Sequence, residues 1–358
     1  MQLHPEQTEE QLTDRTSRAL LVIGAEDVEA VLGGREMEIM NLVREAYASH
    51  ARGQSSLPHS SFLRFPDQVN NRIIALPAYL AEPFSVAGIK WIASFPGNHD
   101  KRLDRASAVI VLNSITTGRP EALLEGSVIS AKRTAASAAL AAQYLHPNQG
   151  EEIAGFVGCG LINFEIARFL MCAFGKLNRF VLFDTSKQNA EVFRERCRSL
   201  GRPLEIEIAT SLQQLLQTAP LLSFATTAAQ PHLDSIPNVF KSTTLLHISL
   251  RDISPGVIVQ SDNVVDDVDH VCRAQTSLDL ARQSAGHMNF IRATLGEVIL
   301  GRAASRDDSH PITIFSPFGL GILDLALSQF ALNEARVRRL GLEVPSFLPQ
   351  SWMHTNAR

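Results

Sequence analysis

The feature that most constrains the fold is a glycine pair placed between a strand-like and a helix-like segment. EEIAGFV at 151–157 has the length and composition of a buried strand, and NRFVLFD at 178–184 has the same character. Between them, LINFEIARFLMCAFG at 161–175 repeats apolar residues at helical spacing. This order predicts a strand–turn–helix–strand unit with Gly158 and Gly160 in the turn.

Such a unit favours a dinucleotide cofactor. A glycine at the turn lets the backbone approach a pyrophosphate, and the helix N-terminus offers free N–H groups. Asp184 lies 26 residues after Gly158, close to the position of the acid that binds ribose hydroxyls, and its charge would repel a 2′-phosphate. These residues predict NAD rather than NADP. The third glycine of G-x-G-x-x-G is Asn163 here, so a purely structural turn stays open on the motif alone.

The remaining segments predict an α/β fold with two domains. Strand-like runs at 204–211, 221–227 and 243–250 indicate a doubly wound parallel Rossmann sheet, so we expect an NAD-binding domain over residues 146–312. Residues 1–145 mix amphipathic helices with several strand candidates, and end in an alanine-rich helix at 127–145. Together with 313–358 they are expected to form an α+β domain for substrate binding and dimerisation.

Composition excludes several classes of protein. The net charge of −4 gives no basic footprint for nucleic acid, and no apolar run reaches the roughly 18 residues that span a bilayer. The first residues are polar and acidic, unlike a signal peptide, so we expect a cytoplasmic protein. The cysteines, which lack C-x-x-C spacing, predict buried thiols and no structural metal site; they are Cys159, Cys172, Cys197 and Cys272. DDVDHVC at 266–272 likewise has no metal-ligand spacing and is expected to form a strand end and a capped helix.

Seven collinear motifs resemble the ornithine cyclodeaminase/mu-crystallin family. They are RIIALPAY, GIKWIASFPGN, RASAVIVLN, ISAKRTAAS, VGCGLINFEI, SLRDISPG and ITIFSPFGLGILDLA, and they extend over almost the whole chain. The details of GIKWIASFPGN, GCGLINFEI and DDVDHVCRAQTSLDLA are most similar to the branch of N-(2-amino-2-carboxyethyl)-L-glutamate dehydrogenases. Those enzymes make 2,3-diaminopropionate for siderophores and other natural products.

The resemblance implies roles for three residues. It assigns Lys90 and Arg133 to the grip on a substrate carboxylate, and Asp252, in SLRDISPG, to acid–base catalysis. Lys90 is expected to be catalytic as well as substrate-binding. Asp252 is also expected at the C-terminal edge of a parallel strand, where such sheets place their ligands. From the residues alone, Lys90 could equally be a salt-bridged lysine in an apolar strand, and Asp252 could be a turn or helix cap.

Other candidates rest on fewer observations. Many cyclodeaminases carry a basic residue where this chain has Ser60, so Arg64 or, preferably, Arg72 is expected to receive a further carboxylate, although a surface role is common for any single arginine. The candidate cofactor-binding residues, besides the glycines and Asp184, are Thr134, Leu161, Ile162 and Thr226.

We therefore expect an NAD-dependent enzyme that oxidises and hydrolyses N-(2-amino-2-carboxyethyl)-L-glutamate to 2,3-diaminopropionate and 2-oxoglutarate. Its three carboxylates suit a site with several cations. The alternatives are an ornithine cyclodeaminase, an alanine or ketimine dehydrogenase of the same family, and a crystallin-like NAD(P)-binding protein without turnover. The resemblance also implies a homodimer built through the sheet of the first domain.

Overall fold

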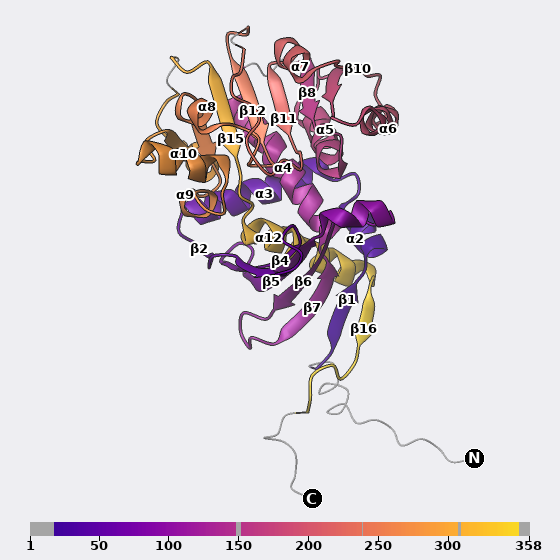
Figure 1. Cartoon of the computed structure of the whole chain (residues 1–358). Coiled ribbons are helices and arrows are strands. Elements are labelled where there is room, and N and C mark those ends of the chain that lie inside the picture. The colour runs from indigo at the N-terminus through magenta and orange to yellow at the C-terminus, as the bar shows by residue number, and fades with distance from the viewer. Residues whose placement is uncertain (1–17, 148–151, 238, 307–308, 351–358) are drawn as a thin grey trace, which may run out of the picture. The chain divides into compact units, whose positions relative to one another are not determined.

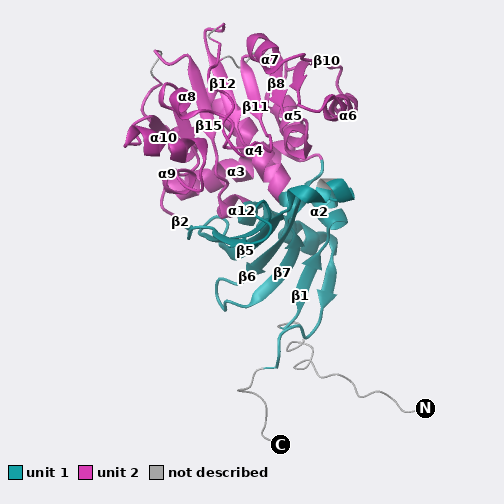
Figure 2. Ribbon diagram, viewed as in Figure 1, with its two compact units in different colours: residues 1–33, 56–129, 324–358 teal, residues 34–55, 130–323 magenta. Residues whose placement is uncertain are grey.

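The computed structural model describes residues 18–147, 152–237, 239–306 and 309–350 (Figure 1). The chain divides into two compact units, residues 1–33, 56–129 and 324–358 forming unit 1 and residues 34–55 and 130–323 forming unit 2 (Figure 2). Residues 1–17, which include the polar and acidic N-terminal stretch, lie outside the described residues. Each unit is built around its own sheet.

Unit 2 contains an eight-stranded sheet in the order β10-β9-β8-β11-β12-β15-β13-β14, and every neighbouring pair in it is parallel. The strands are β8 Ile153–Val157, β9 Arg179–Phe183, β10 Glu205–Ile208, β11 Leu221–Phe224, β12 Thr243–His247, β13 Asp262–Val265, β14 Ile291–Thr294 and β15 Ile312–Ser316. The order β10-β9-β8-β11-β12 is the 3-2-1-4-5 order of a dinucleotide-binding fold. The predicted doubly wound α/β class is confirmed.

Helices connect these strands. They are α5 Leu161–Ala173, α6 Lys187–Arg198, α7 Leu212–Thr218, α8 Pro255–Val259, α9 Val268–Val271, α10 Ser277–Ala285 and α11 Leu295–Ile299. The central strands β8 and β11 are mostly apolar because a parallel sheet is covered on both faces, and the core side chains of β11, such as Leu222 and Phe224, are fully buried.

Two segments that we expected in the first domain, from boundaries at 145 and 313, belong to unit 2. β15 pairs with both β12 and β13, so the parallel sheet continues to Ser316. Helix α3, Glu36–Ala51, contacts α5 and α11 and therefore belongs to unit 2. Its packing against α11 is close, because a Cβ on Gly296 would lie 2.7 Å from the carbonyl oxygen of Tyr47. The chain passes between the units within α4 Ser127–Leu145 and α12 Gly321–Arg338.

Unit 1 has a mixed sheet in the order β16-β1-β7-β6-β5-β4-β2, with β3 also paired to β4. Its elements are β1 Leu20–Ile23, α2 Ala25–Leu32, β3 Ser61–Arg64, β4 Arg72–Leu80, β5 Val86–Ser94, η1 Pro96–Lys101, β6 Ala106–Asn113, β7 Pro120–Glu125 and β16 Leu342–Val344, and β2 Ser55–Ser56 lies at the unit boundary. Register sorts the residues of the central strands onto two faces. Leu76, Lys90, Ile110 and Leu124 stand side by side on the buried face, whereas Trp91 and Val109 share the opposite, exposed one.

Candidate active site

The glycine turn after β8 has the geometry of a cofactor cradle. Gly158 has φ +87°, and a Cβ there would lie 2.6 Å from the carbonyl oxygen of Ala225. The turn therefore lies directly against the end of β11, which requires glycine. Gly160 is the N-cap of α5 without a side-chain cap, and a Cβ on it would meet nothing within 4 Å. The backbone at Gly160 thus adjoins open space, and the first N–H groups of a helix have no intrahelical partner and can bind a pyrophosphate.

Asp184 follows β9 and is tied to the same turn. Its Oδ2 accepts a hydrogen bond from the backbone N–H of Cys159 at 2.8 Å, and its Oδ1 accepts one from the N–H of Ser186 at 2.8 Å. A carboxylate accepts about four hydrogen bonds, so both oxygens can still accept one from a ribose hydroxyl. The structure therefore brings the predicted Gly158, Gly160 and Asp184 together.

Asn163 occupies the place of the missing third glycine and has a definite structural task. Its Nδ2 donates to the carbonyl oxygens of Val157 at 2.9 Å and Gly158 at 2.7 Å, and its Oδ1 accepts from the hydroxyl of Ser223 at 2.7 Å. The side chain thereby ties the first turn of α5 to β8 and β11. We did not predict this role, although an amide in place of the third glycine was a visible signal.

The other candidate cofactor-binding residues lie in different surroundings. Leu161 is exposed and Ile162 is half-buried, both in the first turn of α5. The Thr134 hydroxyl donates to the carbonyl oxygen of Ser130 at 2.7 Å, one turn earlier in α4. Thr226 follows β11 and donates its hydroxyl to Oδ1 of Asp252, so it belongs to the surroundings of that carboxylate.

Asp252 is fully buried just after the end of β12 and is surrounded by polar groups. The hydroxyls of Thr226 and Ser249 donate to Oδ1 and Oδ2 respectively. His232 Nε2 lies 3.2 Å from Oδ1, and His247 Nε2 lies 3.4 Å from Oδ2. This carboxylate therefore stands at the C-terminal edge of the parallel sheet, as we predicted, while its two histidine neighbours were not predicted.

The protonation of this cluster follows from its contacts. Burial by itself would raise the pKa of Asp252, but the contacts with His247, Ser249 and Thr226 outweigh burial and hold that pKa well below its usual range. Burial lowers the pKa of His247 although Asp252 opposes the shift. The site therefore contains an ionised Asp252 and a buried His247 that favours its neutral form.

Arg133 lies in α4 and is nine-tenths buried, with 9% of its surface exposed. Its Nη2 donates to the Ser130 hydroxyl at 3.3 Å, and a Cβ on Gly319 would lie 3.0 Å from its Nη1. Gly319 has φ +96°, and its N–H donates to the buried carboxylate of Asp266 at 2.6 Å. Asp266 thus holds the glycine turn against which the guanidinium lies.

Lys90 is the corresponding buried cation of unit 1. It is 1% exposed in the middle of β5, and its Nζ donates to Oδ2 of Asp324 in α12 at 2.6 Å. Asp324 is fully buried. The charge within an apolar strand therefore has the counter-ion that its burial requires.

Arg64 and Arg72 lie on the same face of the sheet as Lys90. Arg64 pairs with Arg72, Arg72 with Ser94, and Ser94 is four residues beyond Lys90 on β5. Sequence reasoning missed Arg105, which precedes β6 and donates from Nε to the Ser94 hydroxyl at 3.3 Å. Partial burial and the like charge of Arg72 lower the pKa of Arg105. Three arginines therefore gather at this end of the unit 1 sheet.

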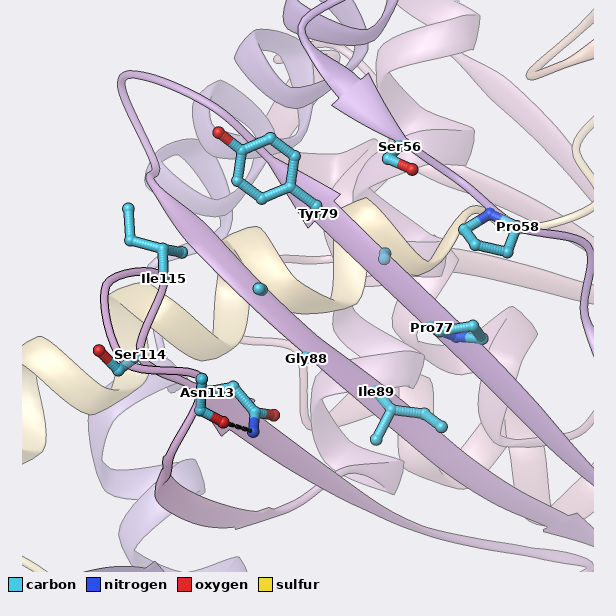
Figure 3. A pocket seen from close by; sticks show the side chains of 12 residues that line it. Ser56, Pro58, Pro77, Tyr79, Gly88, Ile89, Asn113, Ser114 and Ile115 are labelled. Carbon is cyan, nitrogen blue, oxygen red and sulfur yellow. Dashed lines mark hydrogen bonds between the residues drawn. The ribbon is translucent and has the colours of Figure 1, made fainter.

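The opposite face of the same sheet is apolar and contains a pocket of about 520 Å³ (Figure 3). Pro77, Tyr79 and Ile89 line it from β4 and β5, and Ile115 lines it from the turn after β6. That turn is braced by Asn113, whose Nδ2 donates to the carbonyl oxygen of Gly118 at 2.9 Å. Tyr79, Trp91 and Val109 are 39%, 40% and 40% exposed, so this face is an uncovered apolar surface.

The remaining motifs do not add a site. Asp267 is the N-cap of α9 and accepts from the N–H of His270 at 2.8 Å, so the prediction of a capped helix after a strand end is confirmed. Within the described ranges, no group of three His, Cys, Asp or Glu side chains could hold a metal ion. No helix that the structure describes is both long and apolar enough to cross a membrane.

Comparison with known proteins gives one family and several similar enzymes. Residues 21–337 match the ornithine cyclodeaminase/mu-crystallin family. The chain is 26% identical to the N-((2S)-2-amino-2-carboxyethyl)-L-glutamate dehydrogenase of Staphylococcus aureus, over 91% of this chain and 98% of that protein. It is 27% identical, with the same coverage, to the alanine dehydrogenase of Archaeoglobus fulgidus.

Two solved enzyme structures have folds similar to that of this chain. A Thermococcus litoralis Δ1-pyrroline-2-carboxylate reductase in complex with NADH and L-proline has a TM-score of 0.82 at 25% identity, covering 90% of this chain and all of that chain. An archaeal alanine dehydrogenase dimer with bound NAD has a TM-score of 0.80 at 26% identity, covering 91% and 99%.

Proposed function

Because the chain belongs to the ornithine cyclodeaminase/mu-crystallin family, we propose that it is an NAD-dependent dehydrogenase of an amino-acid conjugate, N-(2-amino-2-carboxyethyl)-L-glutamate. The products would be L-2,3-diaminopropionate, for a siderophore or another natural product, and 2-oxoglutarate. The observation that carries the proposal is the gathering of arginines on the Lys90 face of the unit 1 sheet. A substrate with three carboxylates needs such a set of cations, whereas alanine, with one carboxylate, does not.

The glycine turn and Asp184 fit NAD. The pyrophosphate would take the open N-terminus of α5 at Gly160, and Asp184 would accept hydrogen bonds from the adenosine ribose. A 2′-phosphate would meet the carboxylate of Asp184, which supports NAD over NADP. When bound, NAD supplies a hydride acceptor.

The residues of the chain would then act on the substrate. Lys90 and Arg72 in unit 1, and Arg133 in unit 2, would each bind a carboxylate of the substrate. Asp252 accepts the proton of the secondary amine and later orients the water that adds to the imine carbon. The sum is substrate, NAD⁺ and water giving 2-oxoglutarate, 2,3-diaminopropionate, NADH and one proton.

A homodimer through the apolar face of unit 1 is part of the proposal. The exposed Tyr79, Trp91 and Val109 and the pocket between β4 and β5 would be covered by a second copy. The dimeric state of the archaeal alanine dehydrogenase supports this. Sedimentation of the wild type and of Trp91→Glu tests it, since the charged variant should sediment as a monomer.

The test of the substrate is a kinetic comparison. Purified protein with NAD should form NADH from the glutamate conjugate and not from ornithine or alanine. Arg72→Leu should raise KM for the conjugate by about tenfold or more, because one charge-assisted contact is lost. The matched control is Arg119→Leu, which removes an exposed arginine of the same unit that lies before β7. If Arg72→Leu left KM unchanged, the arginine cluster would not bind the substrate.

Alanine dehydrogenase is the second candidate, because the Archaeoglobus relative matches this chain at equal coverage. Formation of NADH from alanine alone would favour it, and the arginines would then need another explanation.

A further inference from the structure

We propose that His232 is the proton outlet of the active site, a positioning residue that moves the proton between the buried Asp252 and solvent. The inference rests on the proposed function, because it concerns the proton that amine oxidation releases.

The reaction needs such an outlet. Each turnover releases one proton, and Asp252, the group that receives it from the amine, is 0% exposed. A carboxylate whose hydrogen bonds hold it in its ionised form cannot retain a proton, so the proton must pass to a neighbour. That neighbour has to contact Asp252, accept a proton near neutral pH and reach water.

His232 meets these three conditions. Its Nε2 lies 3.2 Å from Asp252 Oδ1, and its side chain is 41% exposed. Imidazole is the side chain that exchanges protons most readily near neutral pH. The proton would bind Nε2 as it leaves the carboxylate, and the imidazolium would release a proton to water from its exposed side.

The other groups around Asp252 do not meet these conditions. His247 is 0% exposed, and burial lowers its pKa, so it neither holds the proton nor releases it to water. Thr226 and Ser249 donate hydroxyl hydrogens to the carboxylate and do not titrate near neutral pH. Asp252 and His247 are the titratable groups whose interaction with His232 the structure records.

The backbone holds the imidazole in place. The N–H groups of His232 and Leu233 both donate to the carbonyl oxygen of Asp252 at 2.8 Å, and the N–H of Ser254 donates back to the carbonyl oxygen of Leu233 at 3.0 Å. The segment that carries the histidine is thus fixed to the segment that carries the carboxylate, although 20 positions separate the two residues. These backbone hydrogen bonds keep the two segments at a fixed distance, which direct proton transfer between Asp252 and His232 requires.

The first test does not depend on the substrate. In protein with ¹³C-labelled histidine rings, the signal that His232→Gln removes is the His232 signal, and its chemical shift is compared in wild type and in Asp252→Asn at one pH. The proposal expects the chemical shift to differ between the two proteins, because Nε2 loses its carboxylate partner. The same chemical shift in both proteins would overturn it. The result stands even if the protein oxidises none of the substrates tested.

The second test uses turnover. His232→Ala should lower kcat by about 10²-fold, with free imidazole restoring part of the activity, because general acid–base groups contribute 10²- to 10⁴-fold. NAD binding should stay at its wild-type affinity. His287→Gln, an exposed histidine of the same unit, serves as control and should behave as the wild type. Loss of activity without rescue by imidazole, and with the pH profile of the wild type, would reduce His232 to a structural residue and overturn the proposal.

Discussion

The buried ion pair between Lys90 and Asp324 gives the sharpest prediction about stability. The pair is 2.6 Å long, and its side chains are 2% and 0% exposed. Asp324→Asn leaves a lysine charge buried without a counter-ion. Breaking a buried pair from one side costs about 3–5 kcal/mol, which raises the unfolded-to-folded ratio about 10²- to 10⁴-fold.

Urea unfolding followed by circular dichroism measures this loss. The matched control is Glu195→Gln, which breaks a pair whose side chains are 58% and 60% exposed and should cost no more than about 1 kcal/mol. The double variant Lys90→Met with Asp324→Leu should recover most of the stability, because apolar residues of similar volume can replace a buried pair. If the free energy of unfolding of Asp324→Asn lay within about 1 kcal/mol of the wild-type value, Lys90 would not depend on this counter-ion, and our account of its burial would be wrong.

Three further predictions concern the glycine turn and the carboxylate. Gly158→Ala should destabilise the protein by about 2 kcal/mol or more and weaken NAD binding, because the residue has positive φ and its Cβ would meet Ala225. The control Gly160→Ala should keep wild-type stability. Equal melting temperatures of the two variants would contradict this. The low pKa of Asp252 stabilises the fold at pH values above its ordinary pKa of 3.8, and this contribution is lost as the pH falls through the folded-state pKa. The difference in unfolding free energy between the wild type and Asp252→Asn should therefore shrink on acidification. A difference that stayed constant with pH would refute the reasoning. Burial and the nearby Asp184 raise the pKa of Cys159 to about 12. Iodoacetamide at pH 8 should therefore modify Cys159 slowly in the native protein and rapidly in urea. Rapid labelling of the native protein would show that Cys159 is a thiolate and would contradict this prediction.

The Rossmann unit could be predicted because its local signals agree. The glycine turn, the helical spacing after it and the aspartate that ends the next strand all point to one fold, and the structure places these groups together. The local sequence does not predict which sheet β15 joins, because its apolar run at 312–316 fits a strand of either domain equally well. Only its pairing with β12 and β13 assigns it to the parallel sheet.

The contacts that the sequence did not reveal join distant positions. Lys90 and Asp324 are 234 residues apart, and no periodicity relates them. His232 lies in a segment without helical or strand spacing, and its contact with Asp252 depends on backbone pairing outside the main sheet. Arg105 reaches the other arginines only through the registers of β4, β5 and β6. Such contacts depend on tertiary register, which single-sequence patterns do not contain.

The measurement that tests the central claim most directly follows the hydride. The glutamate conjugate is synthesised with deuterium on the α-carbon of the glutamate part, and the NADH and 2-oxoglutarate formed with NAD are examined by mass spectrometry. Our account predicts one deuterium in each NADH and an equal amount of 2-oxoglutarate without label. Unlabelled NADH, or 2-oxoglutarate that retains the deuterium, would contradict it.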